Sequence, residues 1–344
     1  MASIKDIAAK ANVSTATVSY VLNGTRNVSP KTRERVLKVI EEMQYKPNTI
    51  AQSLKTKKTD TIGVIAEDVT VFNTPEIIDG IHDCAERHDL HILLVNLRLH
   101  KRIGRSFHAV DRFRDVVLSA VDELVGKQVD GMIYVGVHSR DLSGLVPPKD
   151  KPIVYTYCYA DNAVSVNYDD ERAAYEATQY LAGLGHRRIG VISGLIDSIP
   201  SRLRFNGFYQ AVMDCGLPFD PGLIKTGDWE TASGERLTRE LMALPEPPTA
   251  ILAMNDVMAV GVLRAAQEIG VRVPQDLSVM GFDNREFSDY LTPRLTTMEI
   301  PLHELGVQSM MALNRIIRDN GAIEEQAKPL CKLIVRDSTG PAPG

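Results

Sequence analysis

The chain has 344 residues, 44% of them hydrophobic and 24% charged, which is the balance of a globular protein with two or three domains. No apolar run approaches the roughly 18 residues of a membrane-spanning helix, and residues 1–14 carry charges where a secretion signal needs an apolar core. We therefore expect a cytoplasmic protein with no membrane partner. The four cysteines form no Cys-x-x-Cys pair, which argues against a zinc site and a disulfide framework.

The net charge of −5 is unevenly distributed along the chain. Residues 1–60 hold eleven Lys and Arg against five Asp and Glu, a balance of +6, whereas the remainder carries −11. A basic segment on an acidic body is expected when only one end of a protein contacts phosphates. Short charged segments are also often only solvated, so the charge alone leaves both interpretations open.

Two short helices are predicted near the N-terminus. Residues 4–11 place apolar side chains at helical spacing after a capping Ser3, and residues 15–22 form a second helix capped by Ser14 or Thr15. Two such helices joined by a tight turn form a helix-turn-helix, whose second helix enters the major groove of DNA. Its outward face is small, polar and free of acidic groups, with Thr15, Ala16, Thr17, Ser19 and Tyr20.

A third helix and a linker follow. Ser29 caps the third helix and Pro30 fits its first turn, so that the three helices share one core. The same helices would also make a small bundle with no role in DNA binding. Residues 47–58 are polar and basic, and they are either a flexible linker or a segment that orders on DNA. Leu54 suits an apolar wedge inserted between base steps of the minor groove.

Apolar runs alternate with helical segments through the rest of the chain. Strands are predicted at residues 61–66, 91–95, 131–137 and 153–156, and again at 188–192, 223–226, 250–253 and 277–280. Helices are predicted at residues 76–89, 173–184, 204–215, 232–243 and 258–269. This alternation predicts parallel, doubly wound sheets, and the two sets of four strands indicate two similar lobes.

The sequence lacks the motifs of the enzymes that share such sheets. A dinucleotide-binding turn needs glycines after the first strand, where Ala66-Glu67-Asp68-Val69 stands instead. There is no GxxxxGK[ST], GxSxG or HExxH segment, and the eight histidines do not cluster at ligand spacing. We expect no enzymatic activity, no metal and no cofactor.

Polar and aromatic side chains follow the predicted strands, at the edge where open α/β folds bind ligands. They are Glu67, Asp68, Asn96, Val137 and Tyr157 in the first set, and Ser193, Asp228, Trp229, Asn255, Asp256 and Asp283 in the second. Carboxylates and amides can bridge adjacent hydroxyls while an aromatic plane covers a C–H face, which suits a small polyhydroxy ligand. Asp and Asn are also common turn and cap residues at such positions.

The segment IKDIAAKANVSTATVSYVLNG and the P-x-x-x-A-x-S-L linker after it resemble the LacI/GalR family of bacterial transcriptional regulators. The resemblance extends over roughly residues 2–338. It implies that Thr15, Ala16 and Tyr20 read bases and that Leu54 is the minor-groove wedge. The full set of implied DNA contacts is Thr15, Ala16, Thr17, Tyr20, Asn23, Ser29, Ala51, Leu54 and Lys55. Gln52 replaces the family's usual arginine, which weakens one phosphate contact.

The body resembles the effector-binding part of the same family. Residues 201–208 match an S-x-x-R-x-x-G-F segment and residues 281–283 match G-[FY]-D. The resemblance implies that Arg204 and Asp283 bind an effector and that Trp229 stacks on it. The implied effector site is Phe72, Tyr157, Ser198, Arg204, Trp229, Asn255 and Asp283. We expect Asp256 to cap a helix instead.

Two features depart from the family pattern. Tyr155, Tyr157 and Tyr159 stand where many relatives carry an aspartate or another polar residue, so this wall of the pocket is bulkier and less acidic. Residues 98–114 are longer than the usual connection and strongly basic. This segment is either a solvated loop and helix start or a contact with a partner or the DNA backbone.

We therefore predict an all-α helix-turn-helix head on an α/β body of the periplasmic-binding-protein type, with two doubly wound parallel-sheet lobes. The predicted limits are residues 1–46 for the head and 47–60 for a hinge. Residues 61–167 with 301–327 form the N-terminal lobe, and 168–300 with 328–340 the C-terminal lobe.

The predicted function is sequence-specific transcription regulation. The protein is predicted to be a repressor whose binding to operator DNA is controlled by a small-molecule effector in the cleft between the two lobes. The expected partners are palindromic double-stranded operator DNA, an effector such as a sugar, and a second copy of the chain in a homodimer. A nucleobase or other small metabolite acting as corepressor is the alternative effector. A sugar-binding protein without a DNA role, and an enzyme using Asp283 as a base, are the rival functions.

Overall fold

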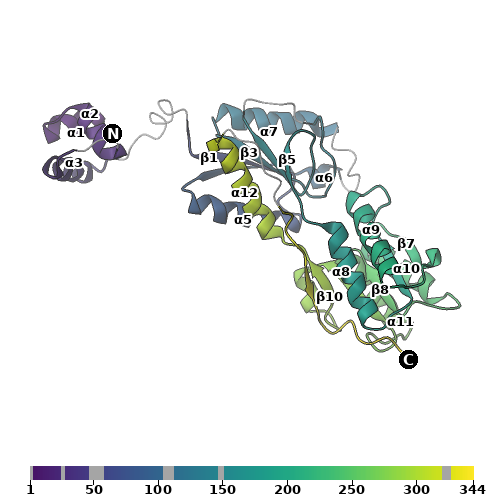
Figure 1. Ribbon diagram of the computed structural model, residues 1–344. Coiled ribbons are helices and arrows are strands. Elements are labelled where there is room, and N and C mark those ends of the chain that lie inside the picture. The colour runs from purple at the N-terminus through teal and green to yellow at the C-terminus, as the bar shows by residue number, and fades with distance from the viewer. Residues whose placement is uncertain (1–2, 25–27, 46–57, 104–111, 146–150, 320–326) are drawn as a thin grey trace. The chain divides into compact units, whose positions relative to one another are not determined.

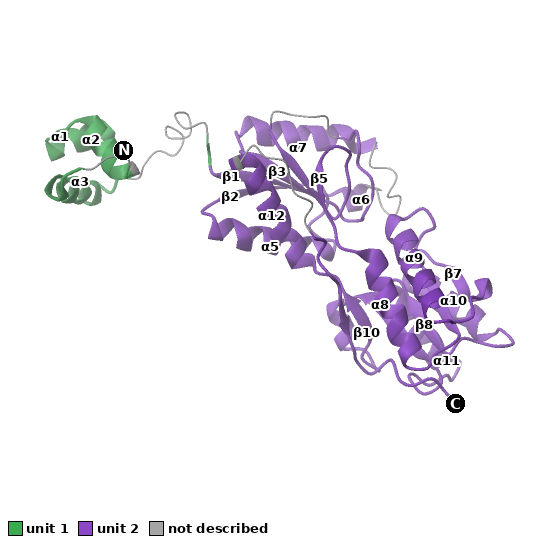
Figure 2. Cartoon of the chain, in the orientation of Figure 1, with its two compact units in different colours: residues 1–59 green, residues 60–344 purple. Residues whose placement is uncertain are grey.

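The computed structural model describes residues 3–24, 28–45, 58–103, 112–145, 151–319 and 327–344. The chain divides into two compact units, Met1–Thr59 and Asp60–Gly344, which we call the head and the body (Figure 2). The predicted positions Ala51, Gln52, Leu54 and Lys55 lie outside the described residues. The fold class is the predicted one, a helical head and an α/β body.

The described part of the head consists of the helices α1 (Ile4–Ala11), α2 (Thr15–Asn23) and α3 (Pro30–Glu42) (Figure 1). Each begins at a serine whose hydroxyl accepts a backbone N–H from three residues on, at 3.1–3.3 Å: Ser3, Ser14 and Ser29. Such caps satisfy amides that have no partner within the helix. Of the two candidate caps for α2, Ser14 is the one used. One fully buried side chain from each helix, Ile7, Val18 and Val36, forms the centre of the core.

The first lobe of the body is built on the sheet β2-β1-β3-β4-β5, in which every pairing is parallel. Its strands are β1 (Thr61–Ala66), β2 (His91–Asn96), β3 (Gly131–Val135), β4 (Ile153–Thr156) and β5 (Val164–Val166). Alternate strand residues face opposite sides. Ile62 and Val64 pack in the same core as Ile77 of α5 (Asn73–Arg87), whereas Ile65 packs in the same core as Val121 of α7 (Arg114–Gly126). The short helix α6 (Leu99–Ile103) follows β2.

Helix α5 shares its face of this sheet with α12 (Leu302–Asp319), which comes from the far end of the chain (Figure 1). The two helices approach closely because each has a glycine at the contact. A Cβ on Gly80 would lie 2.0 Å from the His303 carbonyl oxygen, and one on Gly306 would lie 2.1 Å from that of Ile77.

The second lobe is built on the sheet β11-β10-β9-β8-β6-β7. Its strands are β6 (Ile189–Ser193), β7 (Ile224–Thr226), β8 (Ala250–Ala253), β9 (Ser278–Asp283), β10 (Thr296–Glu299) and β11 (Lys332–Ile334). Its helices are α8 (Asp170–Gly183), α9 (Ile199–Asp214), α10 (Thr231–Met242) and α11 (Asp256–Glu268). The chain passes between the lobes after β5, after β10 and after α12.

The prediction of four parallel strands in each lobe was wrong. The sheets have five and six strands, because β5, β10 and β11 were missed, and β11 runs antiparallel to β10. β5 and β11 have three residues each, too few for a period-two pattern, and β10 begins with two threonines instead of an apolar run. Strand β3 also ends at Val135, two residues before its predicted end.

A buried histidine holds the C-terminal segment on the second lobe. His186 has no exposed surface, and its ring nitrogens lie 2.9 Å from the hydroxyls of Thr249 and Ser278 and 3.1 Å from the Gly340 carbonyl oxygen. Burial lowers the pKa of His186 below its ordinary value of 6.5, against the raising effect of the Gly340 hydrogen bond. The folded protein therefore favours the neutral ring.

This arrangement predicts a loss of stability in mild acid. The unfolded state binds the His186 proton at higher pH than the folded state, so the contribution is complete above pH 6.5 and falls as the pH drops below that value. The slope from one proton is at most about 1.4 kcal/mol per pH unit. Urea unfolding measured at several pH values between 5 and 8 gives the free energy of unfolding as a function of pH. This free energy should change less steeply with pH in His186→Gln than in the native chain. The same change at the exposed His88 is the control, and an unaltered slope in His186→Gln would refute the assignment.

Candidate functional site

A cavity of about 130 Å³ lies between the two lobes of the body, at the C-terminal ends of the strands. The first lobe supplies Val71, Phe72, His100, Val137, His138 and Tyr157, and the second lobe supplies Pro200, Arg204, Trp229, Asn255 and Asp283. This is the edge at which open α/β folds bind ligands.

Six of the seven residues implied as the effector site line this cavity: Phe72, Tyr157, Arg204, Trp229, Asn255 and Asp283. Ser198 does not line it. Its hydroxyl caps α9 and lies 3.0 Å from Nε2 of His138, so it touches the site through that ring. Sequence reasoning missed His100 and His138. His138 lies three residues beyond the end of β3, and His100 lies in the basic segment 98–114, which is longer than the usual connection in the family.

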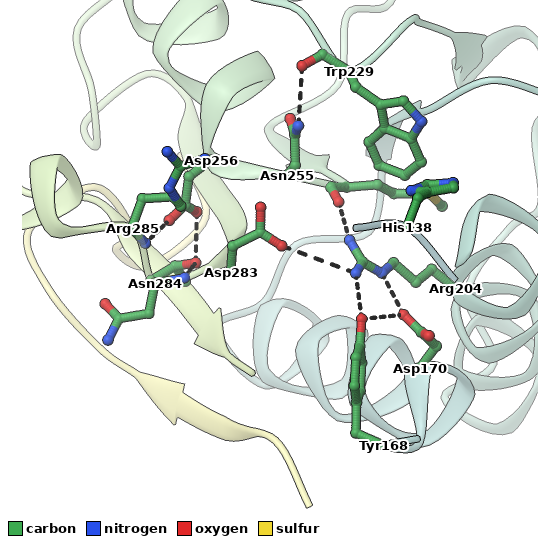
Figure 3. Close-up of polar contacts among 12 residues, drawn as sticks. His138, Tyr168, Asp170, Arg204, Trp229, Asn255, Asp256, Asp283, Asn284 and Arg285 are labelled. Carbon is green, nitrogen blue, oxygen red and sulfur yellow. Dashed lines mark hydrogen bonds and ion pairs between the residues drawn. The ribbon is translucent and has the colours of Figure 1, made fainter. Parts of the chain in front are cut away.

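Arg204 is the most extensively bonded side chain of the site (Figure 3). It is 2% exposed, and its Nε donates to Asp170 at 2.7 Å while Nη2 donates to the Tyr168 hydroxyl at 2.7 Å. Nη1 donates to the Met254 carbonyl oxygen, and Asp283 lies 4.0 Å from Nη2. The guanidinium carbon stands 3.6 Å from the centre of the Phe282 ring. These contacts fix the guanidinium plane before any ligand binds.

Asp283 ends β9 and faces this guanidinium, with a backbone φ of 115°. Burial raises the pKa of its carboxyl well above the ordinary value of 3.8, and Arg204 opposes that rise. A carboxyl group that keeps its proton can donate as well as accept a hydrogen bond. The pair Arg204 and Asp283 therefore offers both kinds of polar group to hydroxyls or ring nitrogens of a ligand.

The expectation that Asp256 caps the helix after β8 was wrong. The cap of α11 is Asn255, whose Oδ1 accepts from the Met258 N–H at 2.8 Å. Asp256 is instead buried, and its carboxylate accepts from Thr297 and Ser288 hydroxyls at 2.6 and 2.7 Å. The physical reason is that α11 begins one residue earlier than predicted. Asn255 is therefore at the N-cap position, from which a side chain reaches the free amides of the first turn.

Trp229 is positioned by two neighbours. Its ring lies against Gly194, where a Cβ would be only 1.9 Å from a ring carbon, and its carbonyl oxygen accepts from Nδ2 of Asn255 at 3.1 Å. The Trp229 backbone has a φ of 72°. Its indole Nε1 is buried and has no hydrogen-bond partner among the described residues.

Contacts between side chains join the lobes around the cavity. His138 lies against Ser198 and approaches the Trp229 ring edge-on, with ring centres 6.0 Å apart. On the other side, the Arg285 guanidinium stands over the Phe72 ring at 4.1 Å. A change in lobe closure must therefore alter contacts made by lining residues themselves.

In the head, the implied DNA-reading residues lie on α2 and at the start of α3. Thr15 and Ala16 are exposed, Thr17 and Tyr20 are half-buried, and Asn23 is the last residue of α2. Ser29 is exposed at the start of α3.

Among the described residues, no group of three or more His, Cys, Asp and Glu side chains could hold a metal ion. None of the described helices is both long and apolar enough to cross a membrane.

Comparison with known proteins agrees with this arrangement. Residues 3–48 match the model of bacterial regulatory proteins of the lacI family, and residues 178–339 match a periplasmic binding protein-like domain. The chain is 33% identical to the HTH-type transcriptional repressor CytR of Escherichia coli K12 over 345 aligned residues, covering 99% of this chain and 97% of the relative.

Two solved structures are similar over nearly the whole chain. The lac repressor dimer bound to operator and the anti-inducer ONPF has a TM-score of 0.77 and 28% identity, covering 98% of this chain and 99% of that one. The complex of transcriptional regulator CelR with cellobiose has a TM-score of 0.65 and 26% identity, covering 98% and 100%. The chain belongs to the LacI family of bacterial transcription regulators.

Proposed function

We propose that the protein is a transcriptional repressor whose affinity for operator DNA is set by a small molecule bound in the interlobe cavity. The observation that carries this proposal is the convergence of Phe72, Arg204, Trp229 and Asp283 on one cavity in a LacI-family chain. Homodimerisation is supported by similarity to the lac repressor dimer, which is described on its operator. A palindromic operator follows from the two-fold symmetry of such a dimer. Because ligand and DNA favour particular lobe arrangements, each must change the affinity of the other.

The proposed effector is a sugar. Arg204 and Asp283 supply hydrogen bonds at one wall, the indole of Trp229 supplies an aromatic face, and the similar CelR is described with cellobiose. A cavity of about 130 Å³ is close to the 150 Å³ that holds benzene in a designed case, so it suits one ring. A nucleobase or another small metabolite acting as corepressor is the second candidate, favoured by the aromatic walls at Phe72 and Tyr157, which can stack on a flat ring.

The sites follow from this assignment. We propose that Phe72, Tyr157, Arg204, Trp229 and Asp283 touch the effector, and that Ser198 and Asn255 act beside them by holding His138 and Trp229. The proposed DNA contacts in the head are Thr15, Ala16, Thr17, Tyr20, Asn23 and Ser29, with Ala51, Leu54 and Lys55 from the hinge.

We assign residues 1–46 to the DNA-binding head and 47–60 to the hinge. The lobes then comprise 61–167 with 301–327 and 168–300 with 328–340. The proposed role requires no catalytic step, and the buried Asp283 is assigned to binding. The proposed role as a transcription regulator requires the protein to be in the cytoplasm, where bacterial DNA is located.

A thermal-shift screen tests the effector. A ligand present at a hundred times its dissociation constant stabilises the folded state by about 2.7 kcal/mol, which raises the melting temperature by several degrees. We expect a monosaccharide to do so, and the same compound to change the affinity of the chain for an operator duplex in gel shifts at several salt concentrations. Stabilisation by nucleobases alone would favour the second candidate, and DNA binding without salt dependence would contradict the regulator itself.

A further inference from the structure

The N-terminal half of α2 offers an unusual set of groups to a DNA groove. From Thr15 to Asn23 the helix has no charged side chain, and its only amide side chain is Asn23 at the C-terminal end. In helix-turn-helix proteins the residues near the start of the second helix contact the base edges. This inference rests on the proposed function, in which the head binds duplex DNA.

The hydroxyls of this half are partly used within the helix. Thr17 Oγ1 lies 2.9 Å from Ser14 Oγ, and the Thr17 N–H donates to that same oxygen at 3.1 Å. Thr17 is therefore committed to the cap and is half-buried. Thr15 and Ala16 are exposed, and Tyr20, four residues after Ala16 on the same face of the helix, is half-buried.

Thr15, Ala16 and Tyr20 lack the side-chain groups that usually recognise guanine, adenine and cytosine. Guanine is read by the paired donors of Arg or Lys, adenine by the paired groups of Asn or Gln, and the cytosine amino group by a carboxylate. Thr15, Ala16 and Tyr20 supply none of these. They supply methyl groups and an aromatic edge, which match the C5-methyl group of thymine, whereas their single hydroxyls do not distinguish the base pairs.

We propose that the base pairs contacted by Thr15, Ala16 and Tyr20 of α2 are T·A pairs, recognised through thymine methyl groups. The ligand class of the head is thus a duplex with thymines at these positions of each half-site. Specificity at each pair is modest, because one methyl contact replaces a bidentate hydrogen bond.

The test uses the full chain and synthetic duplexes. Selection from a random duplex pool gives the preferred half-site, and each thymine in it is then replaced singly by deoxyuracil, which removes the methyl group and keeps the base pairing. At the α2 positions we expect binding to weaken about fourfold per methyl, from the transfer free energy of one buried carbon group. A 5-methylcytosine·guanine pair at the same position should bind more tightly than the unmethylated pair.

A protein variant locates those positions independently. Tyr20→Arg introduces the paired donors that read guanine, so the selected sequence should gain a G·C pair at one position of each half-site. The matched control Leu37→Arg places the same charge at a 47% exposed site on α3 and should leave the selected sequence unchanged. Circular dichroism and melting of both variants establish that the head is folded.

The outcomes separate the inference from the function beneath it. Equal affinity for every uracil-substituted duplex, or G·C pairs in the native selection at the position that Tyr20→Arg changes, would overturn the thymine assignment while leaving operator binding intact. If the pool yields no enriched sequence, operator binding itself fails, and the assignment falls with it.

Discussion

Replacing Arg204 by alanine should abolish the response to effector and destabilise the body. The change removes the donor to Asp170, Tyr168 and the Met254 carbonyl oxygen, and leaves the buried carboxyl of Asp170 without its cation. Removing one partner of a buried ion pair costs about 3–5 kcal/mol of stability. Loss of a buried, charged contact to the ligand weakens binding by about thirtyfold or more.

A neighbouring arginine gives a matched control for this variant. Arg202 lies on the same helix but is exposed, so Arg202→Ala should leave both effector binding and the melting temperature close to native values. Calorimetric titration with the compound found by thermal shift, together with urea unfolding, measures both effects. Native affinity in Arg204→Ala would mean that the effector binds elsewhere.

A single methyl group added at Gly194 should displace the tryptophan that forms one wall of the cavity. The Cβ of Gly194→Ala would lie 1.9 Å from the Trp229 ring, far inside contact distance, so the ring must move. Because Trp229 is the only tryptophan of the chain, its fluorescence reports that movement directly. We expect a shifted emission maximum and about tenfold weaker effector binding, which corresponds to about 1.4 kcal/mol.

The control for this variant is Gly183→Ala, at the end of α8, where an added Cβ meets nothing within 4 Å. It makes the same chemical change and should leave emission and affinity as in the native chain. If Gly194→Ala also binds the effector normally while its emission shifts, Trp229 is a bystander and the aromatic face lies elsewhere.

The sequence predicted the parts of the fold that depend on local patterns. The head helices follow from capping serines and apolar spacing, and the eight predicted strands fall on short segments rich in apolar residues. Strands β5, β10 and β11 were not predicted because they are stabilised by contacts with distant parts of the chain and not by a local pattern. In β10, for example, the Thr296 N–H donates to the Ser338 hydroxyl at 2.8 Å. Such partners are distant in the chain.

The cavity was predictable to a similar degree. Residues at strand ends, such as Trp229 and Asp283, were found because parallel strands bring their ends together. His138 and His100 were not found, since they reach the cavity from a loop and from a short helix whose paths follow from packing. The exchange of roles between Asn255 and Asp256 turns on a one-residue shift in where α11 begins, the least predictable feature of any helix.

The uneven bonding of the two cavity walls has a consequence for how new ligand preferences arise. On the second-lobe wall, Arg204 donates to the Asp170 carboxyl and to the Met254 carbonyl oxygen, and Asn255 donates to the Trp229 carbonyl oxygen. Changing one of these side chains therefore requires compensating changes in its neighbours. On the opposite wall, Val71 and Val137 line the cavity with apolar side chains. Evolution, or a directed library, should therefore find altered ligand preference in single steps at these two positions.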